Sequence, residues 1–252
     1  MKTTLLKSLG ILMCLGLLQA CDNDDDSTDI IANAGTISGG PFSFCIDGDP
    51  DFVNGISVNS SDAMGMNATW VITDDQGSIL GLPPTMEALE AVNFDDAGPG
   101  LCLIWYLRYE GEISGAEVGM NANDIEGNFD LSNSIDVQRN QPEAGTISGG
   151  PFEFFVDGEA DFVSGITLDD SEISGSNSTW VITDDQGNIL GLPPTLEAVE
   201  GVNFDEAGPG VCLIWYLRFE DGLSGAEAGM NAADLQGCFD LSNSITVNRI
   251  EP

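Results

Sequence analysis

Short apolar segments that alternate with polar positions recur along the chain, and glycine, asparagine and aspartate separate them. Residues 41–46 alternate before an Asp-Gly pair, and residues 69–80 contain two such segments around Asp-Asp-Gln-Gly, which predicts a β-hairpin. Residues 101–107 are apolar at successive positions, as in a central strand that is buried on both faces. The pattern of residues 134–139 predicts an edge-like strand that closes the unit. Residues 85–91 are the only candidate for a helix, and it would be short. Strands this short and this closely spaced predict an antiparallel sandwich.

The pattern occurs twice. The stretch AGTISGGPF begins at Ala34 and again at Ala144, an offset of 110 that holds without a gap. Within residues 70–89, 17 of 20 positions equal their counterparts. An internal repeat of this length predicts two independent domains, residues 34–143 and residues 144–252.

The first copy places Cys45, Trp70 and Cys102 in an order that loosely matches an immunoglobulin domain, although Phe155 replaces the first cysteine in the second copy. The expected fold class is therefore all-β, with two tandem antiparallel β-sandwich (immunoglobulin-like) domains after a signal peptide and an acidic tether.

The N-terminus has the features of a leader. Two lysines precede an apolar segment, residues 9–18, that is too short to cross a bilayer of roughly 30 Å as a helix. The sequence Leu-Gln-Ala-Cys at residues 18–21 resembles the lipobox of bacterial lipoproteins. That resemblance implies that residues 1–20 are a signal peptide and that the thiol of Cys21 carries the lipid, which would anchor the chain to a membrane.

An acidic tether follows, residues 21–33. Four of the five residues 22–26 are aspartate, and this run resembles the surface-export signal of Bacteroidota lipoproteins. The resemblance implies a lipid-anchored protein of the outer membrane that faces the cell exterior. A solvated spacer that holds the domains away from the membrane is the alternative.

A repeat of secreted and surface proteins of marine Bacteroidota resembles three further stretches, TWVITDDQGNILGLPP, FDEAGPGVCLIWYLRFEDGLSGAE and GCFDLSNSITVNR. The resemblance covers nearly all of residues 34–252. It implies a modular surface protein and transfers no activity and no catalytic residue.

The charge is strongly unbalanced. The chain has 42 Asp plus Glu and six Lys plus Arg, and after the leader only four arginines remain, so the formal charge is 4 − 42 = −38. Such a surface repels phosphate backbones and anionic lipids, which excludes nucleic acid as a partner. Divalent cations, neutral glycans and cell-surface proteins stay possible.

Catalytic chemistry is restricted by missing residue types. The chain has no histidine, which excludes histidine dyads and triads. No lysine follows the leader, and the glycine-rich stretches precede no helix, so no nucleotide site is expected. Only a carboxylate pair, as in glycosidases, remains open. The sequence therefore predicts no catalytic residue and no enzyme.

One loop has a spacing that suits calcium. Carboxylates occupy alternate positions at Asp47, Asp49 and Asp51, and the second copy keeps the spacing. The candidate metal ligands are Asp47, Asp49, Asp51, Asp157, Glu159 and Asp161, with further oxygens from Asp74, Asp75 and Asp95 and their counterparts. Hard oxygen ligands at positions 1, 3 and 5 suit Ca²⁺. Ordinary turn chemistry, in which aspartate accepts from the backbone, explains the same pattern.

Three aromatic residues of each copy, Trp70, Trp105 and Tyr106 in the first, could form a sugar-stacking platform or belong to the core. Trp105 and Tyr106 are adjacent in a strand and point to opposite faces. One of them must therefore leave the core, unless a further layer covers it.

Four cysteines follow the tether: Cys45, Cys102, Cys212 and Cys238. Pairing within each copy would require the equivalent Cys102 and Cys212 to reach different strands. We therefore expect both to be free buried thiols and Cys45 to pair with Cys238 across the copies, where Asn128 and Phe155 mark the absent second bridge. Pairing within copies, or free thiols throughout, are the alternatives.

These observations favour a surface-exposed lipoprotein that acts as a non-catalytic binding or adhesion module for a partner protein or a glycan. The alternative is a calcium-dependent structural module of a cell-surface assembly, and a carboxylate-dependent glycosidase is the third hypothesis.

Overall fold

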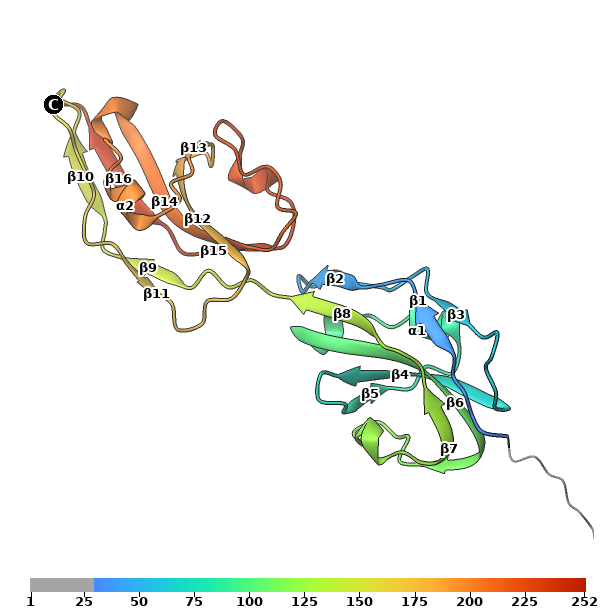
Figure 1. Cartoon of the computed structure of the whole chain (residues 1–252). Helices are drawn as coiled ribbons and strands as arrows, with labels where there is room; N and C mark the ends of the chain where they lie inside the picture. The colour runs from blue at the N-terminus through green and yellow to red at the C-terminus, as the bar shows by residue number, and fades with distance from the viewer. Residues whose placement is uncertain (1–29) are drawn as a thin grey trace, which may run out of the picture. The chain divides into compact units, whose positions relative to one another are not determined.

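The computed structural model describes residues 30–252 (Figure 1). The first domain consists of β1 (Thr36–Ser38), β2 (Phe42–Cys45), β3 (Ser57–Asn59), β4 (Asn67–Asp74), β5 (Ile79–Gly81), α1 (Met86–Glu90), the 3₁₀ turn η1 (Asp95–Ala97), β6 (Gly100–Ser114), η2 (Ala122–Asp124), β7 (Glu126–Leu131) and β8 (Ile135–Asn140).

The second domain repeats this order. It consists of β9 (Thr146–Ser148), β10 (Phe152–Phe155), β11 (Thr167–Asp169), β12 (Asn177–Asp184), β13 (Ile189–Gly191), α2 (Leu196–Glu200), η3 (Asp205–Ala207), β14 (Gly210–Phe219), η4 (Ala232–Asp234), β15 (Phe239–Leu241) and β16 (Ile245–Ile250). The expected all-β fold of two tandem sandwich domains is confirmed.

Each domain has a large and a small sheet. In the first domain the large sheet has the order β2-β8-β6-β4-β5, with β7 also paired to β6, and β1 pairs with β3 in the small sheet. Two expectations need correction. The closing strand β8 is internal, because it pairs with β6 on one side and β2 on the other, and the β2–β8 pair is parallel. The sandwich is therefore antiparallel except at this pair and its counterpart, β10–β16.

The large sheet carries a hydrophobic core on each face. On one face Trp70, Ile72 and Ile104 pack with Ile37 of the small sheet and Leu89 of α1. On the other face a second cluster forms, to which the segment that leads to β7 and β7 itself contribute residues; its members include Val71, Ile79, Leu107, Ile125, Trp105 and Phe129. Successive residues of β4 and β6 are buried because both faces are covered, as the apolar run in residues 101–107 predicted.

Two of the repeated motifs contact each other. In the first domain Asp130 Oδ2 accepts from the backbone N–H of Ala34 at 2.8 Å, and Asn133 Oδ1 accepts from that of Ile37 at 2.9 Å. The second domain makes the same two bonds from Asp240 and Asn243. The AGTIS and DLSNS motifs therefore recur because side chains of one position the backbone of the other.

Local signals were accurate for the hairpin and the helix. Strands β4 and β5 pair antiparallel, and Asp74 Oδ1 accepts from the backbone N–H groups of Gln76 and Ser78 at 3.0 and 2.7 Å within the turn. Helix α1 begins after Thr85, whose hydroxyl accepts from the N–H of Ala88. The hairpin and the short helix are therefore confirmed.

Candidate functional site

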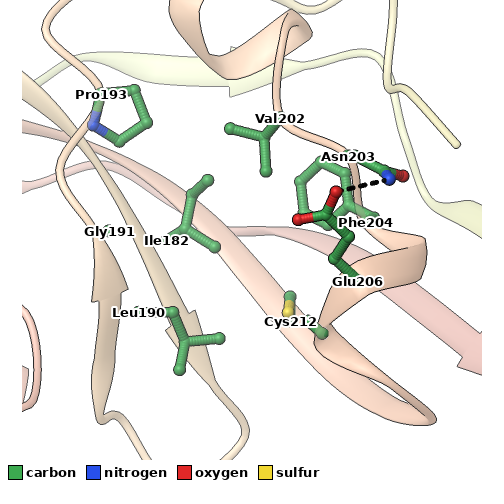
Figure 2. A pocket seen from close by; sticks show the side chains of 10 residues that line it. Ile182, Leu190, Gly191, Pro193, Val202, Asn203, Phe204, Glu206 and Cys212 are labelled. Carbon is green, nitrogen blue, oxygen red and sulfur yellow. Dashed lines mark hydrogen bonds between the residues drawn. The ribbon is translucent and has the colours of Figure 1, made fainter. Parts of the chain in front are cut away.

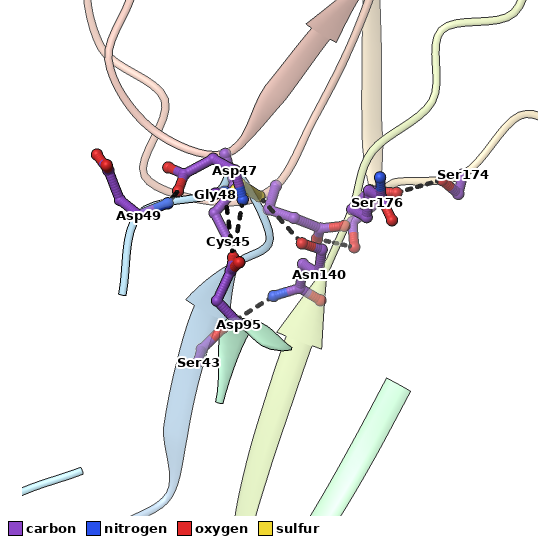
Figure 3. Close-up of a disulfide and its surroundings, with 12 residues drawn as sticks. Ser43, Cys45, Asp47, Gly48, Asp49, Asp95, Asn140, Ser174 and Ser176 are labelled. Carbon is purple, nitrogen blue, oxygen red and sulfur yellow. Dashed lines mark hydrogen bonds between the residues drawn. A yellow bond between two sulfur atoms is a disulfide. The ribbon is translucent and has the colours of Figure 1, made fainter. Parts of the chain in front are cut away.

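The structure joins Cys45 and Cys238 through a disulfide (Figure 3). Cys45 ends β2 and Cys238 directly precedes β15, and their Cα atoms are 5.3 Å apart, within the usual range of about 4.4–6.8 Å. Cys102 and Cys212 are free and buried. Burial raises the pKa of both thiols, while the neighbouring guanidinium of Arg139 or Arg249 opposes the shift. These two thiols are therefore unreactive at neutral pH.

The loop expected to bind calcium uses its carboxylates as acceptors for the backbone. Asp95 Oδ1 accepts from the N–H groups of Asp47 and Gly48 at 3.1 and 3.3 Å (Figure 3), and Asp47 Oδ1 accepts from the N–H of Asp49 at 2.9 Å. The second copy repeats these bonds with Asp205 and Asp157. Between residues 30 and 252 no group of three or more acidic or cysteine side chains is arranged to hold a metal ion. The geometry here is that of a turn.

Asp51 differs from the other carboxylates of this loop. Its Oδ2 atom is buried without a hydrogen-bond partner in the described residues. Burial raises the pKa of Asp51, and the charges of Asp47, Asp95 and Asp49 raise it further. A cation or a proton at this position would relieve that cost.

The aromatic residues do not form an exposed platform. Trp70 is 3% exposed and packs against Tyr106 with ring centroids 4.9 Å apart. Trp105 lies in the cluster on the other face, half-buried, and its Nε1–H donates to Thr73 Oγ1 at 3.1 Å. The further layer that the adjacent aromatics required is this second cluster.

All four arginines of the described chain donate to backbone carbonyls. Arg139 and Arg249, which are 5% and 7% exposed, donate to Gly98 and Gly208. The other two donate in the same way: Arg108 to Gly65, and Arg218 to Ser174 and Gly175. The cationic groups thus hold loops in place, and they leave the surface dominated by carboxylates.

An apolar pocket occurs at the same place in both domains. In the second domain it has a volume of about 330 Å³ and lies between the β12–β13 hairpin and the segment after α2 (Figure 2). Its lining comprises Ile182, Leu190, Gly191, Pro193, Val202, Asn203, Phe204, Glu206, Ala207 and Cys212. The pocket of the first domain measures about 380 Å³. Sequence reasoning missed both pockets.

Nine lining positions are shared by the two pockets, and the residue is identical at each. One of the nine is an exposed leucine of the outer strand: Leu80 is 43% exposed and Leu190 46%. The one carboxylate among the lining residues of the two pockets is that of Glu206, which accepts from Asn203 Nδ2 at 3.3 Å (Figure 2). The repeated Leu-Gly-Leu-Pro-Pro segment contributes to both pockets, but the exposure of its first leucine is visible only in the structure.

Lipidation lies outside the described residues, since Cys21 and the leader precede residue 30. Among the described residues, no helix is both long enough and apolar enough to cross a membrane.

No family model and no curated protein matches the chain. Among solved structures the chain is similar to human protocadherin-24 EC1-2, at 8% identity and a TM-score of 0.29, over 87% of this chain and 99% of that one. It is also similar to Drosophila N-cadherin EC1-3, at 9% identity and a TM-score of 0.21, over 87% of this chain and 69% of that one.

Proposed function

We propose that this chain is a lipid-anchored, surface-exposed and non-catalytic binding protein, and that each domain offers one apolar pocket to a partner protein. The observation that carries the proposal is the recurrence of the pocket, with identical residues at nine shared lining positions. Placement on the cell surface rests on the resemblance of residues 18–26 to lipoprotein signals.

The pockets are suited to an apolar side chain. Their walls are mostly aliphatic, and an exposed leucine, Leu80 or Leu190, stands beside each. Full burial of a leucine side chain contributes about 1.5–3 kcal/mol, so two such contacts contribute substantially to affinity. Pockets that are apolar, concave and already formed are typical binding sites.

Charge specifies the partner further. Beyond the leader the chain carries 42 acids and four arginines, and those arginines donate to internal carbonyls. A partner segment with basic residues beside its apolar anchor would be attracted over a long range and would associate faster. An acidic partner would be repelled.

The absence of catalysis is supported by the same residues. The two pockets contain one carboxylate between them, Glu206, whereas hydrolysis of a glycoside by carboxylates requires two. The sequence also lacks histidine.

Photo-crosslinking on intact cells tests the proposal. A photoreactive amino acid at position 80 or 190 of the full chain should form crosslinks to one and the same partner. Met66 is the control position, because it is 80% exposed and its counterpart is Ser176. Replacement of both leucines by aspartate should weaken binding at least tenfold. Crosslinks that are equal at all three positions, or unchanged binding by the double variant, would refute the proposal.

One observation favours a second candidate, a calcium-dependent structural module. Among the described residues the buried Oδ2 atom of Asp51 has no hydrogen-bond partner, and the charges of Asp47, Asp49 and Asp95 act on it. A divalent ion supplied there would offset their repulsion. Equal melting midpoints with calcium and with chelator, at about 0.15 M salt, would exclude this candidate.

A further inference from the structure

A different pocket lies on the opposite face of the large sheet in the first domain. It has a volume of about 240 Å³ and is formed by the turn between β4 and β5, the η2 segment and strand β6. Its apolar lining includes Leu103, Trp105 and Leu131, and its polar side chains include Asp75, Gln76 and Asn123. One small pocket thus combines an aromatic wall with a carboxylate and two amides.

The pocket is held in a fixed shape. Asn121 Nδ2 donates to the carbonyl of Gln76 at 2.9 Å, and the N–H of Ala122 donates to the carbonyl of Gly77 at 2.8 Å. Gly77 has φ +86, and a Cβ atom there would lie 3.1 Å from Asn121 Oδ1. A larger residue at this position would therefore be strained by its positive φ and would require Asn121 to shift. A site formed in advance loses little entropy on binding.

The lining residues are available for a ligand. The bond from Trp105 Nε1 to Thr73 Oγ1 fixes the indole ring, which is half-buried. Asp75 and Gln76 are exposed, and their side chains make no hydrogen bond with any residue of the described chain. Asn123 Nδ2 donates to Asn121 Oδ1 at 2.8 Å, which orients the amide and leaves its oxygen as an acceptor.

We propose that this pocket binds one neutral hexopyranose ring, placed against Trp105 and hydrogen-bonded through its hydroxyls to Asp75, Gln76 and Asn123. A sugar ring has an apolar C–H face and polar edges, which match an aromatic wall beside carboxylate and amide groups. Acidic sugars are disfavoured by the Asp75 carboxylate. The volume of about 240 Å³ is below the roughly 300–1,000 Å³ of sites for larger ligands, so one ring fills it.

The second domain differs at one lining position. Every other lining residue of this pocket has an identical counterpart there, whereas Ala233 stands where the first domain has Asn123. The sugar therefore binds in the first domain and lacks one hydrogen-bond partner in the second. This site is separate from the paired apolar pockets, which lie on the other face.

The test uses the full lipidated chain in a detergent without sugar groups, labelled with ¹⁵N at tryptophan. The probes are the methyl glycosides of glucose, galactose and mannose, and the signals are the indole N–H resonances, assigned with Trp105→Phe and Trp215→Phe. At least one glycoside should shift the Trp105 signal saturably while Trp215 stays unchanged. Asn123→Ala, which installs the residue of the second copy, should weaken binding roughly tenfold. Ala233→Asn should make Trp215 respond as well.

Three results would overturn the inference: no glycoside shifts Trp105, Asn123→Ala binds as well as the native chain, or Trp215 responds equally before the substitution. Replacement of Leu80 and Leu190 by aspartate should leave the sugar response intact. Failure of the partner-binding proposal and failure of the sugar site are therefore distinguishable.

Discussion

Replacement of both Cys45 and Cys238 by serine should destabilise the domain that unfolds first much more than the other. The disulfide joins residues separated by 193 positions. Cys45 is the register partner of Asn140 at the end of β8, and Cys238 Sγ lies 3.7 Å from the Asn140 carbonyl, 98 residues earlier in the chain. If the second domain unfolds while the first stays folded, the bond therefore closes a loop of about 100 residues.

The magnitude follows from loop length. In the chain-entropy model a loop of about 100 residues stabilises the folded state by about 4.7 kcal/mol. If the first domain unfolds while the second stays folded, the loop runs from Cys45 to Ala144 and again has about 100 residues. Ala144 is the anchor at that end, because its N–H donates to Asp240, two residues from Cys238. Once both domains are unfolded, the number of residues in the loop has roughly doubled. This doubling adds only about 0.6 kcal/mol to the stabilisation by the disulfide. The bond therefore stabilises the first transition by about 5 kcal/mol and the second by less than about 1 kcal/mol.

Denaturant unfolding of the oxidised chain and of the double serine variant measures both transitions, with tryptophan fluorescence and circular dichroism as probes. We expect the less stable domain of the variant to unfold at a much lower denaturant concentration, while the last transition hardly moves. The control is Cys102→Ala with Cys212→Ala, which leaves the bond intact. Equal displacement of both transitions would refute the reasoning, as would a Cys45–Cys102 fragment in non-reducing peptide maps.

Four further outcomes are expected. Cys21→Ser should release the protein from membranes or block its maturation, and alanine at residues 24–26 should leave it lipidated but protected from external protease. In chelator, Asp51→Asn should raise the melting midpoint at pH 7 but not near pH 3. The folded state raises the pKa of the Asp51 carboxyl, so the protonated carboxyl favours folding at low pH, and this stability is lost as the pH rises and the carboxyl ionises. Asp161→Asn, the equivalent change in the second domain, is the control. Asp130→Ala should cost about 1–3 kcal/mol in denaturant unfolding, because the backbone N–H of the buried Ala34 loses its acceptor.

The positions of the strands along the chain were easier to predict than the order in which the strands pair in the sheet. Periodicity located the hairpin, the helix and the central strand, but it placed residues 134–139 at an edge. Ile135, Val137 and Arg139 are buried and alternate with exposed residues. This alternation shows that one face of the strand is covered and the other is open to solvent. It says nothing of the strands bonded to its two edges. Because β2 pairs with β8 in parallel after a long connection, no local signal marks that neighbour.

The pockets illustrate a different limit. The lining of the first pocket combines a strand, a hairpin, the segment after α1 and the start of β6. Each contributes residue types that also form cores, so only the tertiary arrangement separates Leu80 from a core leucine. The calcium pattern is ambiguous for a related reason: alternate aspartates suit a metal or a turn equally well, and the backbone N–H groups that donate to Asp95 and Asp47 become visible only in the folded loop.

Two differences between the copies depend on each other. In the first copy the N–H of Ala32 donates to Asn128 Oδ1 at 2.9 Å. In the second copy their counterparts are Pro142, which has no N–H, and Cys238, which forms the disulfide. Asparagine at position 238 would lack that donor, and cysteine at position 128 would leave the N–H of Ala32 without its acceptor. In the second copy the proline therefore removes the donor of this hydrogen bond, and the disulfide of Cys238 stands where the first copy has the acceptor.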